Sequence, residues 1–442
     1  MFTSTTSRIL AAALSFAPIL PTFAQDVDGD TGDVSTAIDA AIASDGGGDD
    51  SGAALLDGNA PTGLEDSPGG FSLFPGLKVD LSGSTSYIYD SNTTQSATPD
   101  SASLFAFGFG ATAKSGPENQ RGAFYGLEYT GQAFLYTDSA DDFGRDPYEH
   151  YFGGYLGVNG GKTHIRLDVD YHRNNGNSIQ WDRIQRETRR AASHDYGFNL
   201  GVKRDLFRGD LELGFGYFLR DFDPGTGVGD GENVFTDLAW MTTPSFAPKS
   251  SVGLGVRFGN DEYDGQPSQD STAPSLRWRY RVSGKTSLHN SLGYEFRSID
   301  SPGAEDSENF VYSGGIDWAA TSKTGFGLAY YRNVQPSYVL NGEDSTNTGI
   351  NVQMRNDLPG RFELTSRVGF ENAEYFSSAA GAAAGRDDDF VRLSVELSHP
   401  VAITERLRGQ WAIFYNHNQN DSSQALYEFD QNITGIRFGF VY

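Results

Sequence analysis

Residues 164–172 read His-Ile-Arg-Leu-Asp-Val-Asp-Tyr-His, so apolar and polar side chains alternate one for one. Successive side chains of a β-strand point to opposite faces, which places Ile165, Leu167 and Val169 on one face. The other face carries three charged side chains, Arg166, Asp168 and Asp170. Because an apolar face suits lipid and a charged face suits water, the stretch predicts one strand in the wall of a transmembrane β-barrel.

The same alternation recurs in eighteen short segments between Leu77 and the last residue, Tyr442. An even number of strands is what bacterial single-chain barrels have. We therefore predict an all-β fold, an antiparallel up-and-down transmembrane barrel of about 18 strands within residues 71–442. The predicted strand centres are residues 78–89, 103–113, 125–135, 151–158, 164–172, 195–203, 211–220, 234–241, 251–258, 276–282, 288–297, 310–318, 326–331, 348–355, 362–371, 391–397, 407–415 and 432–442.

The connections between these segments are predicted to alternate strictly, a short one and then a long one. Short connections in such barrels are periplasmic turns and long ones are extracellular loops, which places both ends of the chain in the periplasm. A soluble β-propeller also repeats short strands, but it would show a period of about 40 residues with a blade signature. The sequence shows no such period, so the membrane barrel is favoured over propellers and other soluble all-β folds.

Composition agrees with a polar interior. The hydrophobic fraction is 38% and the mean hydropathy is −0.45, both low for a packed core in a chain of 442 residues. Aromatic residues make up 13%, which is typical of strands and of the aromatic girdles of outer-membrane barrels. The chain has no cysteine, which excludes disulfides, thiolate metal sites and cysteine nucleophiles.

The N-terminal residues divide into two segments that lie outside the predicted barrel. Residues 1–24 resemble a secretory signal peptide, with Arg8 before an apolar run and a small-residue cleavage site ending at Ala24. Residues 25–70 contain eleven acidic residues and no basic one, so they bury too little apolar area to fold. We expect an acidic, disordered periplasmic tail there, with a plug in the lumen as the alternative.

The last strand ends Phe438-Gly439-Phe440-Val441-Tyr442. Its alternating aromatics, Phe438, Phe440 and Tyr442, look like the C-terminal signal that the barrel-assembly machinery recognises in outer-membrane proteins. With the strand layout, this ending resembles the beta-barrel porin family of Gram-negative bacteria, some members of which are encoded among exopolysaccharide genes. The resemblance implies an outer-membrane location after secretion by a signal peptide, with lipids, lipopolysaccharide and the assembly machinery as partners.

Two basic features stand out within this layout. Arg277, Arg279 and Arg281 occupy three inward positions of one strand, and such ladders of arginine favour anions in pores. Eight of the nine long loops are net acidic, whereas the third, residues 173–192, is net basic. If that loop folds inward, its arginines would complete a basic constriction: Arg183, Arg186, Arg189 and Arg190.

The competing interpretation is that inward carboxylates pair with the strand arginines and stiffen the wall. The pore-lining candidates are Arg277, Arg279, Arg281, Arg166, Asp168 and Asp170.

Catalytic and ligand-binding motifs are weak throughout the sequence. Two Gly-Lys-Thr stretches, at residues 161–163 and 284–286, lack the upstream glycine of a phosphate-binding loop. We predict no metal site, no cofactor and no enzyme activity, and the net charge of −25 disfavours nucleic acid. The acidic loops either bind divalent cations that bridge lipopolysaccharide or keep the surface soluble, and solvation is favoured.

The sequence therefore predicts a channel through which polar, and in part anionic, solutes or saccharides diffuse passively. Two alternatives stay open: a barrel that assists exopolysaccharide secretion or attachment, and a closed structural barrel.

Overall fold

A computed structural model describes residues 71–442, apart from residue 75 and residues 117–120, 138–146, 177–190, 225, 227, 302–305, 338–342 and 378–384. The described part of the chain folds into strands joined by turns and loops. No helix among these residues is long and apolar enough to cross a membrane.

The structure contains nineteen strands in the described residues. The first ten are β1 (Phe71–Phe74), β2 (Leu77–Asp90), β3 (Ala102–Ser115), β4 (Gly122–Tyr136), β5 (Tyr148–Asn159), β6 (Thr163–Asn174), β7 (Ser193–Leu206), β8 (Gly209–Phe222), β9 (Gly231–Thr242) and β10 (Ser250–Tyr263). The other nine are β11 (Gln269–Ser283), β12 (Thr286–Ile299), β13 (Ser307–Ala319), β14 (Thr324–Pro336), β15 (Glu343–Leu358), β16 (Phe362–Ser377), β17 (Asp387–Ala402), β18 (Arg408–Ser422) and β19 (Phe429–Val441).

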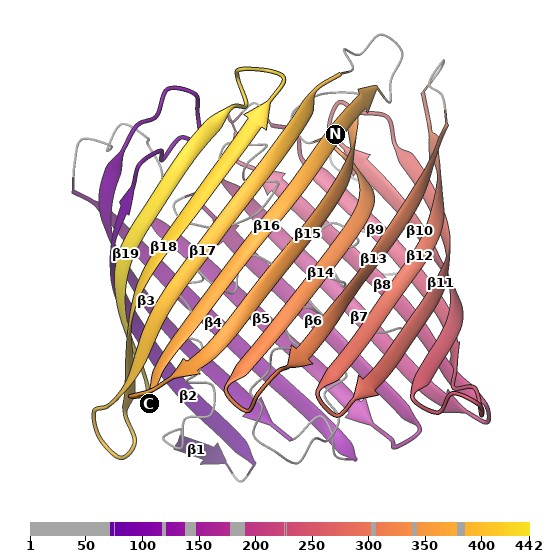
Figure 1. Ribbon diagram of the computed structural model, residues 1–442, viewed down its shortest axis with the longest axis horizontal. Coiled ribbons are helices and arrows are strands. Elements are labelled where there is room, and N and C mark those ends of the chain that lie inside the picture. Colours follow the sequence, from indigo (N-terminus) through magenta and orange to yellow (C-terminus); the bar gives the residue numbers. More distant parts are fainter. Residues whose placement is uncertain are drawn as a thin grey trace.

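Strands β2 to β19 form a closed barrel of eighteen strands (Figure 1). Each strand pairs antiparallel with the next one along the chain, and β19 pairs with β2 to close the sheet. The predicted fold class and all eighteen predicted strands are therefore confirmed. The short β1 was not predicted as a strand; it pairs with the beginning of β2 below the barrel in Figure 1.

The two faces of the wall differ as the alternation requires. On β3 the outward side chains Phe105, Phe107 and Phe109 are 40%, 44% and 54% exposed, and the side chains between them are small or point inward. Outward aromatic rings contact each other from strand to strand, as Phe109 and Tyr129 do with ring centroids 5.5 Å apart. An apolar, aromatic outer face of this kind is suited to lipid.

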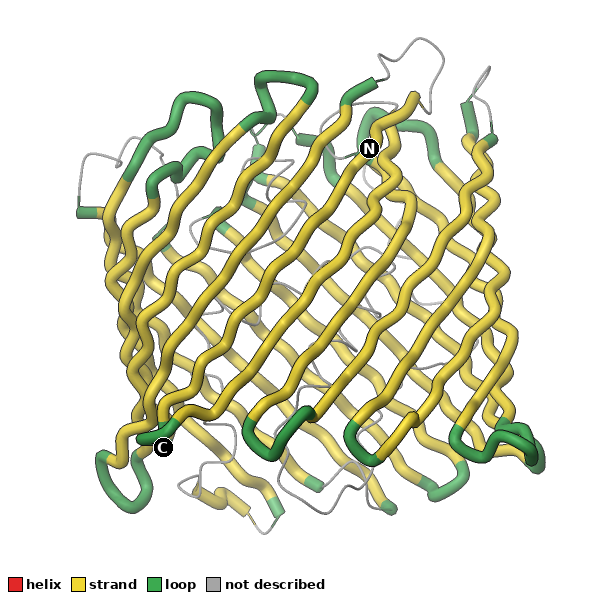
Figure 2. The backbone as a smooth tube through the Cα atoms, viewed as in Figure 1, coloured by secondary structure: helices red, strands yellow, loops and turns green. Residues whose placement is uncertain are grey.

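The alternation of short and long connections holds with one exception. Most turns at the lower end of the barrel in Figure 2 are short, such as residues 207–208 and 284–285, whereas the loops at the upper end include residues 91–101. However, the lower connection between β9 and β10, residues 243–249, is longer than the upper connection between β10 and β11, residues 264–268. The prediction of a strict alternation is thus wrong at this place, because Pro244 and Pro248 extend the turn and a hairpin needs only a few residues.

The seam between β19 and β2 is closed by backbone and side-chain contacts. The amide and carbonyl of Tyr442 bond the carbonyl and amide of Leu81 at 2.8 and 3.1 Å. The ring of Phe440 lies over Gly83, where an added Cβ would be 2.6 Å from the ring carbon Cζ. At the other end of the seam, Gln431 donates from its amide nitrogen to the buried carboxylate of Asp90 at 2.9 Å.

Candidate functional site: the lumen wall

The inward face of the barrel is identified by contacts that span several strands. Arg279 on β11 donates two hydrogen bonds to the carboxylate of Glu212 on β8, at 2.7 and 2.9 Å. These strands are three places apart in the sheet. Side chains diverge on a convex surface and converge on a concave one, so this contact places both residues in the lumen.

The predicted arginine ladder occupies this face, but its members differ. Arg277 donates through both terminal nitrogens to Asp237 on β9, and the Nη1 bond is 2.8 Å long. Arg279 is 30% exposed and its partner Glu212 only 4%, so this carboxylate is held out of water by its arginine. Arg281 lies exposed near the lower end of β11, and no ion pair to a described residue is formed by its guanidinium.

The second predicted group, on β6, also forms a pair. Arg166 donates to both carboxylate oxygens of Asp168 at 2.7 to 2.9 Å, and its guanidinium carbon lies 4.6 Å from the ring centroid of Tyr155. Asp170 lies two residues further along, with its carboxylate over Gly197 of β7. The glycine provides the room for this carboxylate against the wall.

Further ion pairs line the rest of the lumen. Arg297 is 4% exposed and contacts both Asp261 and Glu295 at 2.8 and 2.9 Å. On the opposite part of the sheet, Arg437 contacts Glu396 at 2.9 Å. Of the two interpretations of the strand arginines, these contacts fit structural pairing for Arg277, Arg279 and Arg166.

Besides Arg281, two inward arginines have no carboxylate within ion-pair distance among the residues that the structure describes. Arg257 on β10 lies over the ring of Phe235, with its guanidinium carbon 4.1 Å from the centroid. Arg367 on β16 lies near Arg392 of β17, which contacts Glu371 at 3.8 Å, and the buried Nε of Arg367 has no hydrogen-bond partner in the described structure. Neither was predicted as a site residue from the sequence, although each is a single cation at an inward position between small or polar neighbours.

The other predicted functional residues fall outside this wall. The constriction candidates Arg183, Arg186, Arg189 and Arg190, together with segments 1–24 and 25–70, lie outside the described residues. The aromatics of the predicted assembly signal lie at the seam: Phe438 and Phe440 are 38% and 39% exposed on the outer face, and Tyr442 follows β19. No group of three or more metal-ligating side chains occurs in the part of the chain that the structure describes.

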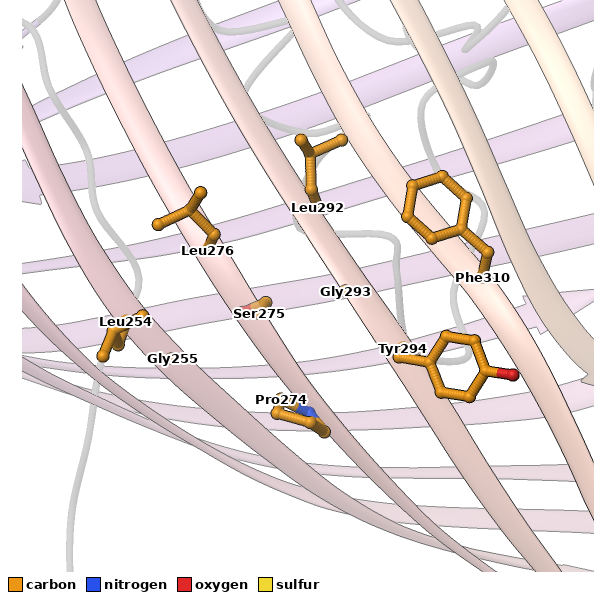
Figure 3. A pocket seen from close by; sticks show the side chains of 9 residues that line it. All are labelled: Leu254, Gly255, Pro274, Ser275, Leu276, Leu292, Gly293, Tyr294 and Phe310. Atoms are coloured by element: carbon orange, nitrogen blue, oxygen red, sulfur yellow. The ribbon is translucent and has the colours of Figure 1, made fainter.

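A depression of about 550 Å³ lies on the outer face of β10 to β13 (Figure 3). Its floor is formed by the backbone at Gly255, Ser275 and Gly293. The ladder between β11 and β12 is interrupted here, because paired residues end at Thr272 with Phe296 and resume at Ser275 with Gly293. Leu254, Leu276, Leu292 and Phe310 line it and are exposed, so the depression faces lipid rather than the lumen.

The upper rim has a small polar depression beside the loop after β8. Arg173 donates to both oxygens of Asp223 at 2.7 Å, and this hydrogen bond lowers the pKa of the Asp223 carboxyl. Burial raises the pKa of the neighbouring Asp230, although that carboxylate also accepts a hydrogen bond from the amide of Phe222 at 2.7 Å. At the rim, Arg173 thus favours the charged form of Asp223, whereas burial disfavours the charged form of Asp230.

No protein-family model matches the chain, and no curated protein matches it. Among solved structures, it is similar to the outer membrane protein OpdK from Pseudomonas aeruginosa, with 14% identity, a TM-score of 0.45, and coverage of 84% of this chain and 100% of that one. It is also similar to a BenF-like porin from Pseudomonas fluorescens Pf-5, with 14% identity, a TM-score of 0.46, and coverage of 83% and 99%. A third is Pseudomonas aeruginosa OccK2 in complex with glucuronate, with 14% identity, a TM-score of 0.43, and coverage of 82% and 97%. The first of these is an outer membrane protein and the second is a porin.

Proposed function

We propose that the protein is an outer-membrane channel through which small polar solutes diffuse passively. The observation that carries this proposal is the closed barrel of eighteen strands with charged, ion-paired side chains on its inner face. Barrels of 16 to 18 strands are wide enough to leave an aqueous channel between their inward side chains. The apolar outer face with exposed aromatics supports a location in a lipid bilayer.

The channel works without covalent chemistry or a cofactor in this proposal. Solutes with hydroxyl or carboxylate groups exchange water for donors and acceptors of the wall as they pass, so each contact is easily reversed. The predicted signal peptide would direct the chain across the inner membrane, and the aromatics at the seam would serve the barrel-assembly machinery.

The proposal is tested by planar-bilayer recording with the purified full chain. We expect stepwise conductance, and we expect vesicles that contain the protein to swell in an isotonic solution of a small sugar. Protein denatured by heat and treated identically is the control. A correctly folded barrel that gives neither steps nor swelling would be a closed structural barrel, and the proposed channel function would be wrong.

A further inference from the structure

Arg257 differs from the paired arginines of the lumen in how it is held. Its guanidinium lies 4.1 Å from the ring centroid of Phe235, and the two side chains come from neighbouring strands. Stacking on an aromatic face fixes the plane of a guanidinium but uses none of its five N–H donors. Arg257 is therefore held in place while its hydrogen-bonding edge stays open.

The carboxylate nearest to Arg257 in the strand register is already paired with another residue. Asp237 lies directly opposite Arg257 in the pairing of β9 with β10. Asp237 nevertheless accepts both of its strong hydrogen bonds from Arg277, which reaches it from β11 across β10. Arg257 and Arg277 thus have Asp237 as a common neighbour, but only Arg277 pairs with it, and the three side chains together carry one net positive charge.

The route of Arg277 explains why it reaches Asp237. Its guanidinium crosses β10 over Gly255, where an added Cβ would lie 2.6 Å from Nε. Gly255 and Arg257 are two residues apart on the same strand, so they face the same side of the sheet. The Arg277 and Arg257 side chains are thus neighbours on the inner face.

The wall beside Arg257 is made of small residues. Ala273 lies opposite it on β11, and the next inward pair is Gly259 with Ser271. The hydroxyl of Ser271 lies close to Gly259, 2.6 Å from where a Cβ would be. Next to the Arg257 guanidinium, β11 thus contributes no large side chain to the wall, and it contributes one hydroxyl group, that of Ser271.

We propose that Arg257, with Arg277 beside it, binds the carboxylate of small hydroxylated monocarboxylates in the lumen. This inference rests on the proposed channel function and adds a solute class to it. A carboxylate matches the forked donors of Arg257 in geometry, and its single negative charge matches the net charge of the three side chains. A neutral polyol offers no charge to this site, and a dianion would leave one charge unneutralised.

The test is equilibrium binding of gluconate to the folded, detergent-solubilised barrel, measured by saturation-transfer NMR at fixed ionic strength. Sorbitol is the matched neutral probe, because it has a hydroxymethyl group in place of the carboxylate. In Arg257→Gln we expect gluconate to bind about tenfold more weakly or worse, because a hydrogen-bonded charge is lost. Arg257→Lys keeps the charge but loses the fork, so we expect an intermediate loss.

Arg367→Gln is the control variant. It removes one unpaired lumen arginine from β16, six places from β10 in the sheet. At about 4.8 Å per place, that separation exceeds the Debye length of about 8 Å, so gluconate binding should stay within about twofold. Phe235→Leu should weaken binding about two- to fivefold by releasing the plane of Arg257.

Three results would overturn the assignment. The first is that the parent protein binds gluconate no more tightly than sorbitol. The second is that the Arg257 and Arg367 variants lose equal amounts of gluconate affinity, since that would indicate a general effect of charge. Unchanged binding in Arg257→Gln is the third. Selective binding by a barrel that does not conduct would instead refute the channel function and leave the binding site standing.

Discussion

Arg279 and Glu212 join strands β11 and β8 across the two strands that lie between them, through hydrogen bonds of 2.7 and 2.9 Å. The side chain of the glutamate is only 4% exposed, so nearly all of its contact is with protein. A carboxylate buried in this way needs its cation, because an unpaired buried charge is costly.

The first prediction concerns this pair. In Arg279→Ala the lumen gains an unneutralised carboxylate, so we expect the reversal potential in a salt gradient to shift toward cation preference. We also expect the barrel to lose about 1 to 3 kcal/mol of stability. The double variant Arg279→Gln with Glu212→Gln removes both charges and should return the reversal potential close to that of the parent. An unchanged potential in the single variant would show that the pair does not contribute to selectivity.

The second prediction concerns the seam. Valine at Gly83 would meet the ring of Phe440, whose Cζ lies 2.6 Å from an added Cβ. We expect Gly83→Val to cost about 1 to 3 kcal/mol through overpacking. The measurement is the fraction of protein that keeps its compact migration in an unheated gel. Gly284→Ala is the control, because no atom lies within 4 Å of its added Cβ. Equal behaviour of the two variants would contradict the packing argument.

The third prediction concerns Arg386 at the upper rim. Its guanidinium carbon lies 4.2 Å from the ring centroid of Tyr375 and 3.4 Å from that of Tyr427, and it contacts Asp388. Arg386 is 2% exposed and Asp388 is fully buried. Arg386→Gln should therefore destabilise the rim by about 3 to 5 kcal/mol, measured by thermal unfolding. Arg406→Gln changes an exposed arginine and should leave the unfolding temperature unchanged; a similar loss in both variants would refute the role of burial.

The fourth prediction concerns pH at the rim. The hydrogen bond from Arg173 lowers the pKa of Asp223. A carboxyl with a lowered pKa in the folded state stabilises the fold above its unfolded pKa and loses this contribution as the pH falls through the folded value. We expect Arg173→Gln to be less stable than the parent at neutral pH, with the difference shrinking below the ordinary aspartate pKa of 3.8. A difference that persists unchanged in strong acid would point to lost packing instead.

The strands were predictable because each one alone shows which of its faces meets lipid. The alternation around Val169 and Leu167 needs no knowledge of neighbouring strands, since the period of two is a property of the backbone. The exception at residues 243–249 arose because connection length depends on local turn geometry rather than on the side of the membrane. The strand β1 is too short for any alternation to be read from it.

The pairing in the lumen was not predictable in the same way. Arg277 and Asp237 are 40 residues apart and lie on strands that do not pair with each other, so their contact depends on strand tilt and on the space above Gly255. The sequence indicated which side chains point inward and left open which charges neutralise each other. Arg257 was missed for this reason, because it becomes distinctive only once Asp237 is seen to be occupied.

Pro274 lies in the middle of β11, where the ladder with β12 is interrupted between Thr272 and Ser275. Proline has no amide proton to donate, so this stretch is joined to one neighbour less firmly than the rest of the wall. The consequence is mechanical. If the barrel is stretched or begins to open within the bilayer, β11 and β12 separate first at this stretch of their ladder, and amide protons there would exchange with solvent deuterium before those of the paired residues on either side.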